Sequence, residues 1–431
     1  MANILFNFSL KAALQATLAF FAVADALPSI NNARAETSYD ASYVTVWGAS
    51  PQLTEPNNLP PPPFNQTGLV FEDTTIRQTV KVSLKTDFLR LQVSNVLGGT
   101  DLTLNAVTIA LSSNSSSAGG SEINEDTLQD VAFSGSSSFI VPAGALAISD
   151  SIHLSVQAES IVTISIYLQS GQAGNRVTSH PGSRTTSWLI KGNHVRDASL
   201  QDQDAVGVDH WYLISALEGR TLAAGASTIA MIGDSITDGR GSTTNTNNRW
   251  PDQFLSRLQR SDSTSNTAIL NQASGGNRVL GFNGYGQIDR DVIAHSGVKY
   301  CIVLIGINDI GTTPTTPESQ QEVVQRLIEA YRQIITRLHR HDIFVYGGTM
   351  TPPGPKDSDY GHPEREKSRQ AVNKWIRQSG VFDEVIDFDA MVKDPSNAQL
   401  LRKEYDSGDG LHLNPRGYKA MADGIDLGLF S

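Results

Sequence analysis

The chain has 431 residues, of which 39% are hydrophobic and 18% charged, and it contains a single cysteine. This composition is typical of a globular protein of one large or two ordinary domains, and it excludes a disordered chain and an intramolecular disulfide. The formal net charge is −11 and no basic run offsets it, so we expect neither nucleic acid nor an anionic membrane as a partner.

The first 26 residues have the pattern of a secretory signal peptide. Lys11 precedes an apolar run, Ala12–Ala24, which ends in an Ala-x-Ala site at Ala24–Ala26. The run is shorter than a bilayer-spanning helix needs, so we expect a secreted, extracellular protein without a stable membrane anchor; an uncleaved anchor is the alternative. In a secreted protein, the Asn-x-Ser/Thr motifs at Asn65 and Asn114 are candidate glycosylation sites.

Residues 40–220 are predicted to form an antiparallel β-sandwich of the jelly-roll kind. Apolar and polar residues alternate in several short segments, as they do in strands with one buried face. These segments are Ile76–Leu84, Phe88–Val96, Leu102–Leu111, Ser138–Val141, His153–Val156 and Ile161–Leu168. The proline-rich stretch Leu59–Pro63 is predicted to be a loop.

Residues 221–431 change to an alternation of strands and helices. Short apolar runs predict strands at Thr228–Ile232, Lys299–Ile305, Ile343–Tyr346 and Val385–Phe388. Helical periodicity predicts helices at Pro251–Leu258, Gln320–His339, Ser368–Ile376 and Pro415–Ile425. This alternation indicates a sheet with right-handed crossovers, whose ligands bind beyond the carboxyl ends of the strands. Cys301 lies inside an apolar run and is predicted to be a buried, unreactive thiol.

Ser235 follows the first strand predicted in this second region. A serine hydroxyl is a strong nucleophile only when a neighbouring base takes its proton. His412 is the candidate base, and Asp409, three residues earlier, is the candidate partner that orients the imidazole ring. The alternatives are that Asp234-Ser235 only caps a helix, and that Asp409 and His412 belong to an ordinary surface turn.

Three groups are candidate donors for the oxyanion that forms when a serine attacks an ester. They are the side-chain amide of Asn308 and the backbone N–H groups of Gly276 and Ser235. Asn308 closely follows a predicted strand, and Gly276 has no Cβ to obstruct close approach. The alternative for Gly275-Gly276 is a simple turn.

Together these segments resemble the four sequence blocks of the SGNH/GDSL hydrolases. Gly233–Ile236 is similar to the first block, Asn271–Gly276 to the second, Gly306–Asp309 to the third and Asp409–His412 to the last. Ile236 stands where the family name has leucine, and Ala273 where glycine is frequent.

The resemblance implies a flavodoxin-like, three-layer α/β domain with Ser235, Asp409 and His412 as catalytic residues. It also implies an oxyanion hole of Ser235, Gly276 and Asn308, with Asp234 and Asp309 as supporting residues. Three upstream segments look like those of secreted esterases related to xylan-degrading arylesterases, in which a β-sandwich precedes the hydrolase domain. They are Val46–Pro51, Ile76–Val80 and Leu91–Asn95.

We therefore expect a secreted serine esterase that cleaves short-chain esters through an acyl-enzyme, with acetylated carbohydrates, polysaccharides among them, or aryl esters as substrates. The resemblance implies no cofactor, and the scattered histidines predict no metal site. Trp250 and the Gly281–Tyr285 loop are candidate walls for a sugar or aryl group, with ordinary packing as the alternative. The alternative function is a non-catalytic carbohydrate-binding protein with an inert hydrolase-like domain.

Overall fold

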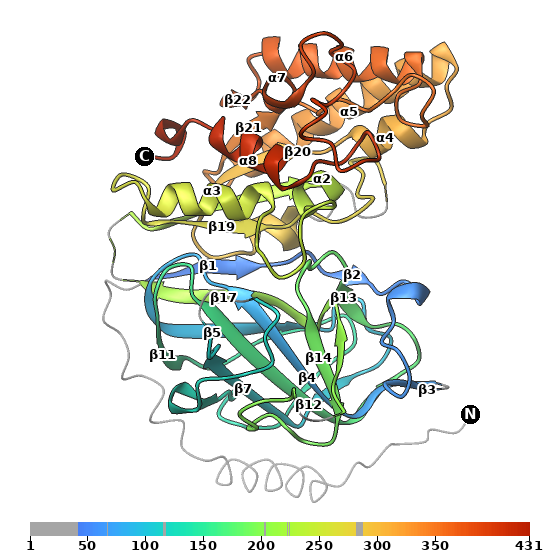
Figure 1. Cartoon of the computed structure of the whole chain (residues 1–431). Coiled ribbons are helices and arrows are strands. Elements are labelled where there is room, and N and C mark those ends of the chain that lie inside the picture. The colour runs from blue at the N-terminus through green and yellow to red at the C-terminus, as the bar shows by residue number, and fades with distance from the viewer. Residues whose placement is uncertain are drawn as a thin grey trace, which may run out of the picture. The chain divides into compact units, whose positions relative to one another are not determined.

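The computed structural model describes residues 42–66, 68–114, 118–201, 204–221, 223, 225–281 and 288–431. The expected signal peptide, Thr67 and Ser116 of the two glycosylation motifs, and residues 282–285 of the candidate wall loop lie outside these ranges. Residues 42–431 form one unit in which antiparallel sheets are followed by a parallel sheet with helices (Figure 1). This order confirms the predicted fold class.

Two antiparallel sheets make up most of the N-terminal region. The first has the order β1-β17-β5-β10, with β11 also paired to β5; the second has the order β15-β14-β4-β12-β7-β8, with β3 also paired to β4. Their bounds are β1 Ser42–Gly48, β3 Asn65–Gln66, β4 Leu69–Lys81, β5 Thr86–Ser94, β7 Ala106–Leu111, β8 Gln129–Asp130, β10 Leu146–Ile148, β11 Ile152–Val156, β12 Ile161–Ala173, β14 Ser187–Lys191, β15 Val206–Val208 and β17 Ile214–Thr221. Alternating apolar side chains of both sheets meet in one core.

Two smaller sheets complete this region, which we call the sandwich region. One has the order β16-β13-β2 (Trp211–Tyr212, Thr178–His180 and Gln52–Leu53) and the other pairs β6 with β9 (Leu102–Leu104 and Phe139–Val141). The segment predicted as one strand over Leu102–Leu111 is two strands, β6 and β7. They separate at Asn105, whose side chain accepts the backbone N–H of Gln169 at 2.8 Å.

The C-terminal region is built on a five-stranded parallel sheet of order β19-β18-β20-β21-β22. The strands are β18 Ser227–Gly233, β19 Thr267–Asn271, β20 Val298–Leu304, β21 Phe344–Gly348 and β22 Glu384–Ile386. The helices are α2 Ser235–Asp238, α3 Trp250–Gln259, α4 Ile307–Thr312, α5 Pro317–His339, α6 Pro363–Gln378, α7 Phe388–Val392 and α8 Pro415–Asp423. The chain adds β19 on one side of β18 and β20, β21 and β22 on the other. With right-handed crossovers, α3 therefore covers one face of the sheet and α5 and α6 cover the other.

Most of these elements agree with the predicted ones to within a few residues at their ends. β19, however, did not stand out from the sequence, because it is a short run that passes directly into the polar segment carrying Gly276. Short 3₁₀ turns occur at Pro56–Asn58, Glu125–Thr127 and Leu427–Phe430, and a π turn at Asp289–Ile293.

The sandwich region and the α/β region share an interface in which β1 lies along β19 (Figure 1). The backbone N–H of Thr45 donates to the carbonyl of Ser296 at 2.8 Å, and the hydroxyl of Thr228 donates to the carbonyl of Thr45 at 2.9 Å. The backbone N–H of Ile269 donates to the hydroxyl of Ser83 at 3.3 Å. The sandwich region is therefore packed against the α/β region over a hydrogen-bonded surface.

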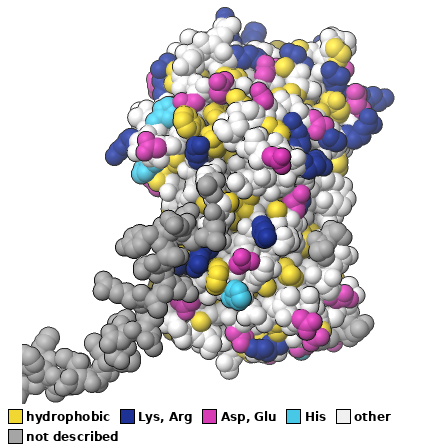
Figure 2. All heavy atoms as spheres, turned by 90° about the vertical axis from the view of Figure 1, so that its left-hand side faces the viewer, with side chains coloured by type: hydrophobic (Ala, Val, Ile, Leu, Met, Phe, Trp, Pro, Cys, Tyr) yellow, Lys and Arg dark blue, Asp and Glu magenta, His cyan; other side chains and the backbone are white. Residues whose placement is uncertain are grey.

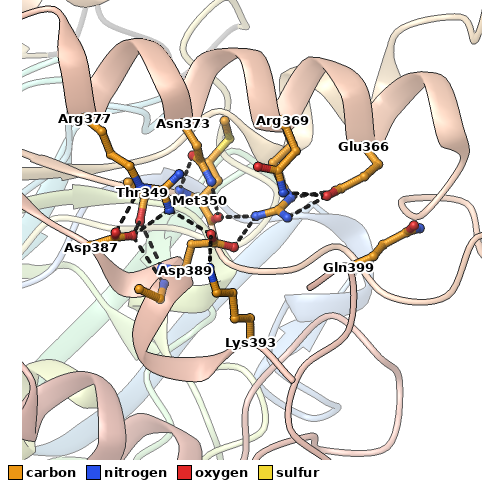
Figure 3. A network of polar contacts seen from close by, with 12 residues as sticks. Thr349, Met350, Glu366, Arg369, Asn373, Arg377, Asp387, Asp389, Lys393 and Gln399 are labelled. Atoms are coloured by element: carbon orange, nitrogen blue, oxygen red, sulfur yellow. Dashed lines mark hydrogen bonds and ion pairs between the residues drawn. The ribbon is translucent and has the colours of Figure 1, made fainter. Parts of the chain in front are cut away.

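A buried polar network holds the chain as it leaves β21 (Figure 3). Arg369 on α6 is fully buried and donates to Asp389 at 2.6 Å and to the carbonyl of Met350 at 2.7 Å. Asn373 donates to the same carbonyl at 2.8 Å, and Arg377 joins Asp387 and Asp389. The loop after β21, which reaches the cleft described below, thus starts from a rigid anchor.

Charged side chains of both signs are interspersed over the face shown in Figure 2. No helix in the described part of the chain is long and apolar enough to cross a membrane. In the same ranges, no three His, Cys, Asp or Glu side chains come together as a metal site would need. Cys301 on β20 is fully buried, and burial raises the pKa of its thiol.

Candidate active site

Ser235 lies where the chain leaves β18. The strand ends at Gly233, and Ser235 is the first residue of α2. Asp234, between them, caps this helix: its carboxylate accepts the backbone N–H of Ile236 at 3.0 Å. The helix-capping alternative therefore applies to Asp234, whereas the hydroxyl of Ser235 is in contact with His412.

The structure brings Ser235, His412 and Asp409 into one chain of hydrogen bonds. Ser235 Oγ lies 2.8 Å from His412 Nε2, and His412 Nδ1 lies 2.7 Å from Asp409 Oδ2. The other carboxylate oxygen of Asp409 accepts the backbone N–H of His412 at 2.8 Å and that of Leu411 at 3.0 Å. This is the geometry in which an imidazole can take a proton from a serine while a carboxylate fixes its tautomer.

The charges around His412 suit a base that is neutral at the start of a reaction. Burial lowers the pKa of His412; the adjacent Asp409 opposes this, and the positive charges of Arg240 and Arg184 add to it. Burial would raise the pKa of Asp409, but the hydrogen bonds donated by His412 and Leu411 outweigh that effect and lower it to about 2. Asp409 is thus ionised wherever His412 can act as a base.

Three unpaired donors line the cleft beside Ser235. Among the described residues, the backbone N–H groups of Ser235 and Gly276 have no acceptor, and one N–H of the Asn308 amide has none. A Cβ on Gly276 would meet nothing within 4 Å, so crowding does not explain the glycine. Its φ of +71° does, because that backbone conformation is costly for other residues.

The Asn308 amide is held from both ends. Its Nδ2 donates to the carbonyl of Asn277 at 3.0 Å, and its Oδ1 accepts the hydroxyl of Tyr360 at 2.7 Å. These two contacts fix which end of the amide carries the free N–H. Asn277 is itself held, because its own Nδ2 donates to the carbonyl of Gly233 at 3.1 Å.

Asp234 and Asp309, the two residues predicted to support the site, accept hydrogen bonds from backbone N–H groups. Asp309 accepts the backbone N–H groups of Val279 and Leu280 at 2.9 and 2.8 Å, and so shapes the turn that follows Gly276. Burial raises the pKa of Asp309, and raises that of Asp234 to about 7, helped by the charges of neighbouring carboxylates. Neither carboxylate is in hydrogen-bond contact with Ser235 or His412 in the structure.

A cleft of about 810 Å³ opens over Ser235, and both regions of the molecule line it. The α/β side includes Gly276, Asn308, Tyr360, Asp409 and His412, and the sandwich side includes Gln52, Leu53, Asn58, Arg184 and His210. Its size lies in the range of sites that enclose a whole small-molecule ligand. The lining is mixed polar and apolar.

One buried pair joins the sandwich region to the helix that begins with Ser235. His180 Nε2 lies 2.9 Å from Asp238 Oδ1, and the two side chains are 4% and 1% exposed. His180 Nδ1 lies 3.0 Å from the carbonyl of Ser50. Both ring nitrogens therefore lie within hydrogen-bond distance of an oxygen atom, one on each region.

Sequence reasoning missed the residues that reach the site from a distance. Tyr360, Arg184 and His180 belong to no motif and lie in loops or at a short strand, so no local signal identifies them. The prediction that Trp250 forms a cleft wall is wrong: its side chain is fully buried, packs against Phe388 with tilted rings and donates to Thr237 at 3.3 Å. It opens α3 and faces the core, as the alternative of ordinary packing had it.

Comparison with known proteins found the GDSL-like Lipase/Acylhydrolase family over residues 231–420. A protein of the G-D-S-L family from Desulfitobacterium hafniense is 18% identical over 46% of this chain and 97% of its own, with a TM-score of 0.36. An acetylxylan esterase from Geobacillus stearothermophilus is 19% identical (46% and 91% covered, TM-score 0.36), and a carbohydrate acetylesterase from Sinorhizobium meliloti is 16% identical (46% and 94%, TM-score 0.34). A search of curated proteins found no match. Residues 231–420 are a domain of the GDSL-like lipase/acylhydrolase family.

Proposed function

We propose that this protein is a serine carboxylic-ester hydrolase that removes short acyl groups, acetyl above all, from a carbohydrate or aryl alcohol. The observation that carries the proposal is the continuous contact from Ser235 Oγ through His412 to Asp409, beside three unpaired hydrogen-bond donors. The family of residues 231–420 supports the reaction class. Polar residues are interspersed with apolar ones in the lining of the cleft, which favours a small acyl group over a fatty chain.

The reaction follows from these positions. His412 takes the proton of Ser235 as Oγ attacks the ester carbonyl, and the resulting oxyanion accepts hydrogen bonds from Ser235 N–H, Gly276 N–H and the Asn308 amide. Collapse of the tetrahedral intermediate breaks the bond to the alcohol, which leaves with the proton from His412. A water molecule, deprotonated by His412, then attacks the acyl-serine, and the carboxylic acid departs as Oγ regains its proton.

The test is hydrolysis of p-nitrophenyl acetate and butyrate by the full chain, beside Ser235→Ala and the control Ser263→Ala, which changes an exposed serine on the turn before β19. Ser235→Ala should lower kcat by about 10⁴-fold or more with unchanged thermal unfolding, while Ser263→Ala should match the native chain. Equal rates in the native chain and Ser235→Ala would refute the nucleophile assignment. Activity of neither protein on these esters or on acetylated xylan would favour the non-catalytic, carbohydrate-binding alternative.

We also propose that the protein is secreted and that Asn65 and Asn114 carry glycans. The support is the signal-like pattern of the first 26 residues together with the two acceptor motifs. Asn114 is exposed and Asn65 is half-buried. N-terminal sequencing of protein collected from the medium, and its mass before and after glycosidase treatment, test both points: an intact Met1 would refute cleavage, and an unchanged mass would refute glycosylation.

A further inference from the structure

Two arginines with unpaired guanidinium groups line the cleft, one from each region. Arg184 comes from the sandwich region, in the loop that follows β13, and Arg240 comes from the turn after α2. Among the described residues, neither side chain forms a hydrogen bond, an ion pair or a cation–π contact, and the Nε atom of Arg184 is buried without an acceptor. A buried donor without a partner is costly, so this donor favours an acceptor that enters from the cleft, either water or a polar group of a ligand.

We propose that Arg184 and Arg240 form an anion subsite that binds a carboxylate on the alcohol part of the ester, so that the preferred substrate is an acylated acidic sugar, such as a uronic-acid-containing oligosaccharide. A guanidinium presents parallel N–H donors that match the two oxygens of a carboxylate. The inference rests on the proposed ester hydrolysis and names the substrate class for it.

The backbone of Arg184 is strained, and hydrogen bonds hold the loop around it in place. Its φ is +51°, a left-handed conformation that a residue with a side chain adopts at a cost. The loop is held around it: Asn245 donates its backbone N–H to the carbonyl of Arg184 at 2.9 Å, and Ser183 and Thr185 are hydrogen bonded to each other. Gly182 lets the loop approach α2, because a Cβ there would lie 1.9 Å from Asp238 Oδ2.

The acidic groups of the cleft leave the arginines available. Asp409 is engaged by His412, Asp238 by His180, and Glu55 by the side chain of Asn58 at 3.1 Å. Asp359 is exposed and its carboxylate has no hydrogen bond in the described structure; it lies beside Tyr360, whose pKa it helps to raise. None of the four carboxylates forms an ion pair with Arg184 or Arg240.

The two arginines also lie near the reacting groups. Each has a positive charge close enough to lower the pKa of His412. Both arginines and Ser235 line the same cleft, so a carboxylate bound by the arginines would lie in the cleft that holds the nucleophile and not at a remote surface. The cleft of about 810 Å³ leaves room beside the acyl group for more than one sugar ring, and its sandwich wall offers polar neighbours to such rings in Gln52, Asn58 and His210.

Binding to the full chain carrying Ser235→Ala tests the subsite without turnover. Isothermal titration with trigalacturonate is compared with its carboxyl-reduced, neutral trimer, so that only the carboxylates differ. We expect the dissociation constant for the acidic trimer to be lower by about tenfold or more, as charge-assisted hydrogen bonds predict. Adding Arg184→Gln or Arg240→Gln should remove most of this preference. Arg340→Gln, which removes an exposed arginine away from the cleft, should keep it.

Each other outcome overturns the inference. Three results would show that the arginines do not bind a sugar carboxylate. They are equal binding of the two trimers, no binding of the acidic trimer at millimolar concentration, and a preference for the acidic trimer that survives both substitutions. Complete displacement of the trimer by an equal concentration of inorganic sulfate would show a general anion site instead. If Arg184→Gln does not fold, Arg240→Gln, whose side chain is exposed, decides the matter.

Failure of this inference is distinguishable from failure of the proposed function. Ser235-dependent hydrolysis of neutral p-nitrophenyl acetate without any preference for the acidic trimer would leave the esterase and remove the anion subsite. A preference for the acidic trimer without hydrolysis of any ester would leave the subsite and remove the esterase.

Discussion

The α/β region and the sandwich region contribute to the cleft in different ways. Every group in the contact from Ser235 to Asp409 comes from the α/β region, and so do the three unpaired donors of Ser235, Gly276 and Asn308, mostly at the ends of parallel strands. The sandwich region contributes no group to that contact, yet it supplies one wall of the cleft and the buried partner of α2, His180. The comparison teaches that reacting groups and substrate-facing groups can be built by separate parts of one chain.

The largest expected effect tests the catalytic side of this comparison. Asp409→Asn keeps the size of the side chain but offers an amide N–H to His412 Nδ1, which favours the wrong tautomer of the ring. We expect kcat on p-nitrophenyl acetate to fall by about 10³–10⁴-fold. Asp423→Asn, an exposed aspartate on α8, serves as the control. A loss smaller than about tenfold would mean that Asp409 does not orient the base.

A second substitution tests whether the sandwich region stabilises α2 in addition to lining the cleft. His180→Ala leaves the carboxylate of Asp238, the last residue of α2, buried without its partner. We expect the free energy of unfolding, measured with urea, to fall by about 3–5 kcal/mol. His339→Ala removes an exposed pair with Asp383 and should cost less than about 1 kcal/mol. If both variants lost the same free energy of unfolding, the buried His180–Asp238 pair would be no more stabilising than the exposed His339–Asp383 pair.

Tyr360→Phe tests whether Tyr360 orients the side-chain amide of Asn308 within the α/β region. It removes the hydroxyl that orients the Asn308 amide and should lower kcat by about tenfold with little change in KM. In an Asn308→Ala background, which itself should cost about 10²–10³-fold, the same change should have no further effect. Tyr43→Phe loses a comparable hydrogen bond to Ser151 far from the cleft and should leave kcat as it was. An additive double variant would refute the positioning role.

The smallest expected effect is on the pH profile, where both regions act on one group. Protonated His412 cannot accept the proton of Ser235, so kcat/KM should fall as the pH drops through the pKa of His412. Because burial and the two arginines lower that pKa, the midpoint should lie below the ordinary 6.5. Arg184→Gln or Arg240→Gln removes a positive charge and should move the midpoint upward, and Arg340→Gln should not. A midpoint that stays or moves downward in both cleft variants would contradict this electrostatic account.

The parts that could be predicted from sequence are those with a local signal. Ser235, Asn308 and His412 could be identified because each stands in a short motif whose residue types suit one reaction, and the α/β order could be predicted because periodicity changes along the chain. The structure brings all three to one cleft.

The parts that could not be predicted depend on packing between distant segments. Arg184 lies in an irregular loop, and only the docking of that loop against α2 brings it to the cleft. Tyr360 lies 52 residues beyond Asn308 and meets it only because the network around Arg369 anchors the chain after β21. Trp250 shows the converse, since nearness in sequence to a motif does not place a side chain in the site.

The loop around Gly182 and Arg184 has a consequence for how such proteins diversify. It is anchored by backbone contacts and by the absence of a side chain at Gly182, whereas its outward side chains are not needed for that anchoring. The outward side chains of this loop can therefore be exchanged without loss of its anchoring, and under the proposed function such exchanges would change the contacts with the alcohol part of the ester. The segments that follow the parallel strands, where Ser235, Gly276 and Asn308 lie, would not change with the loop.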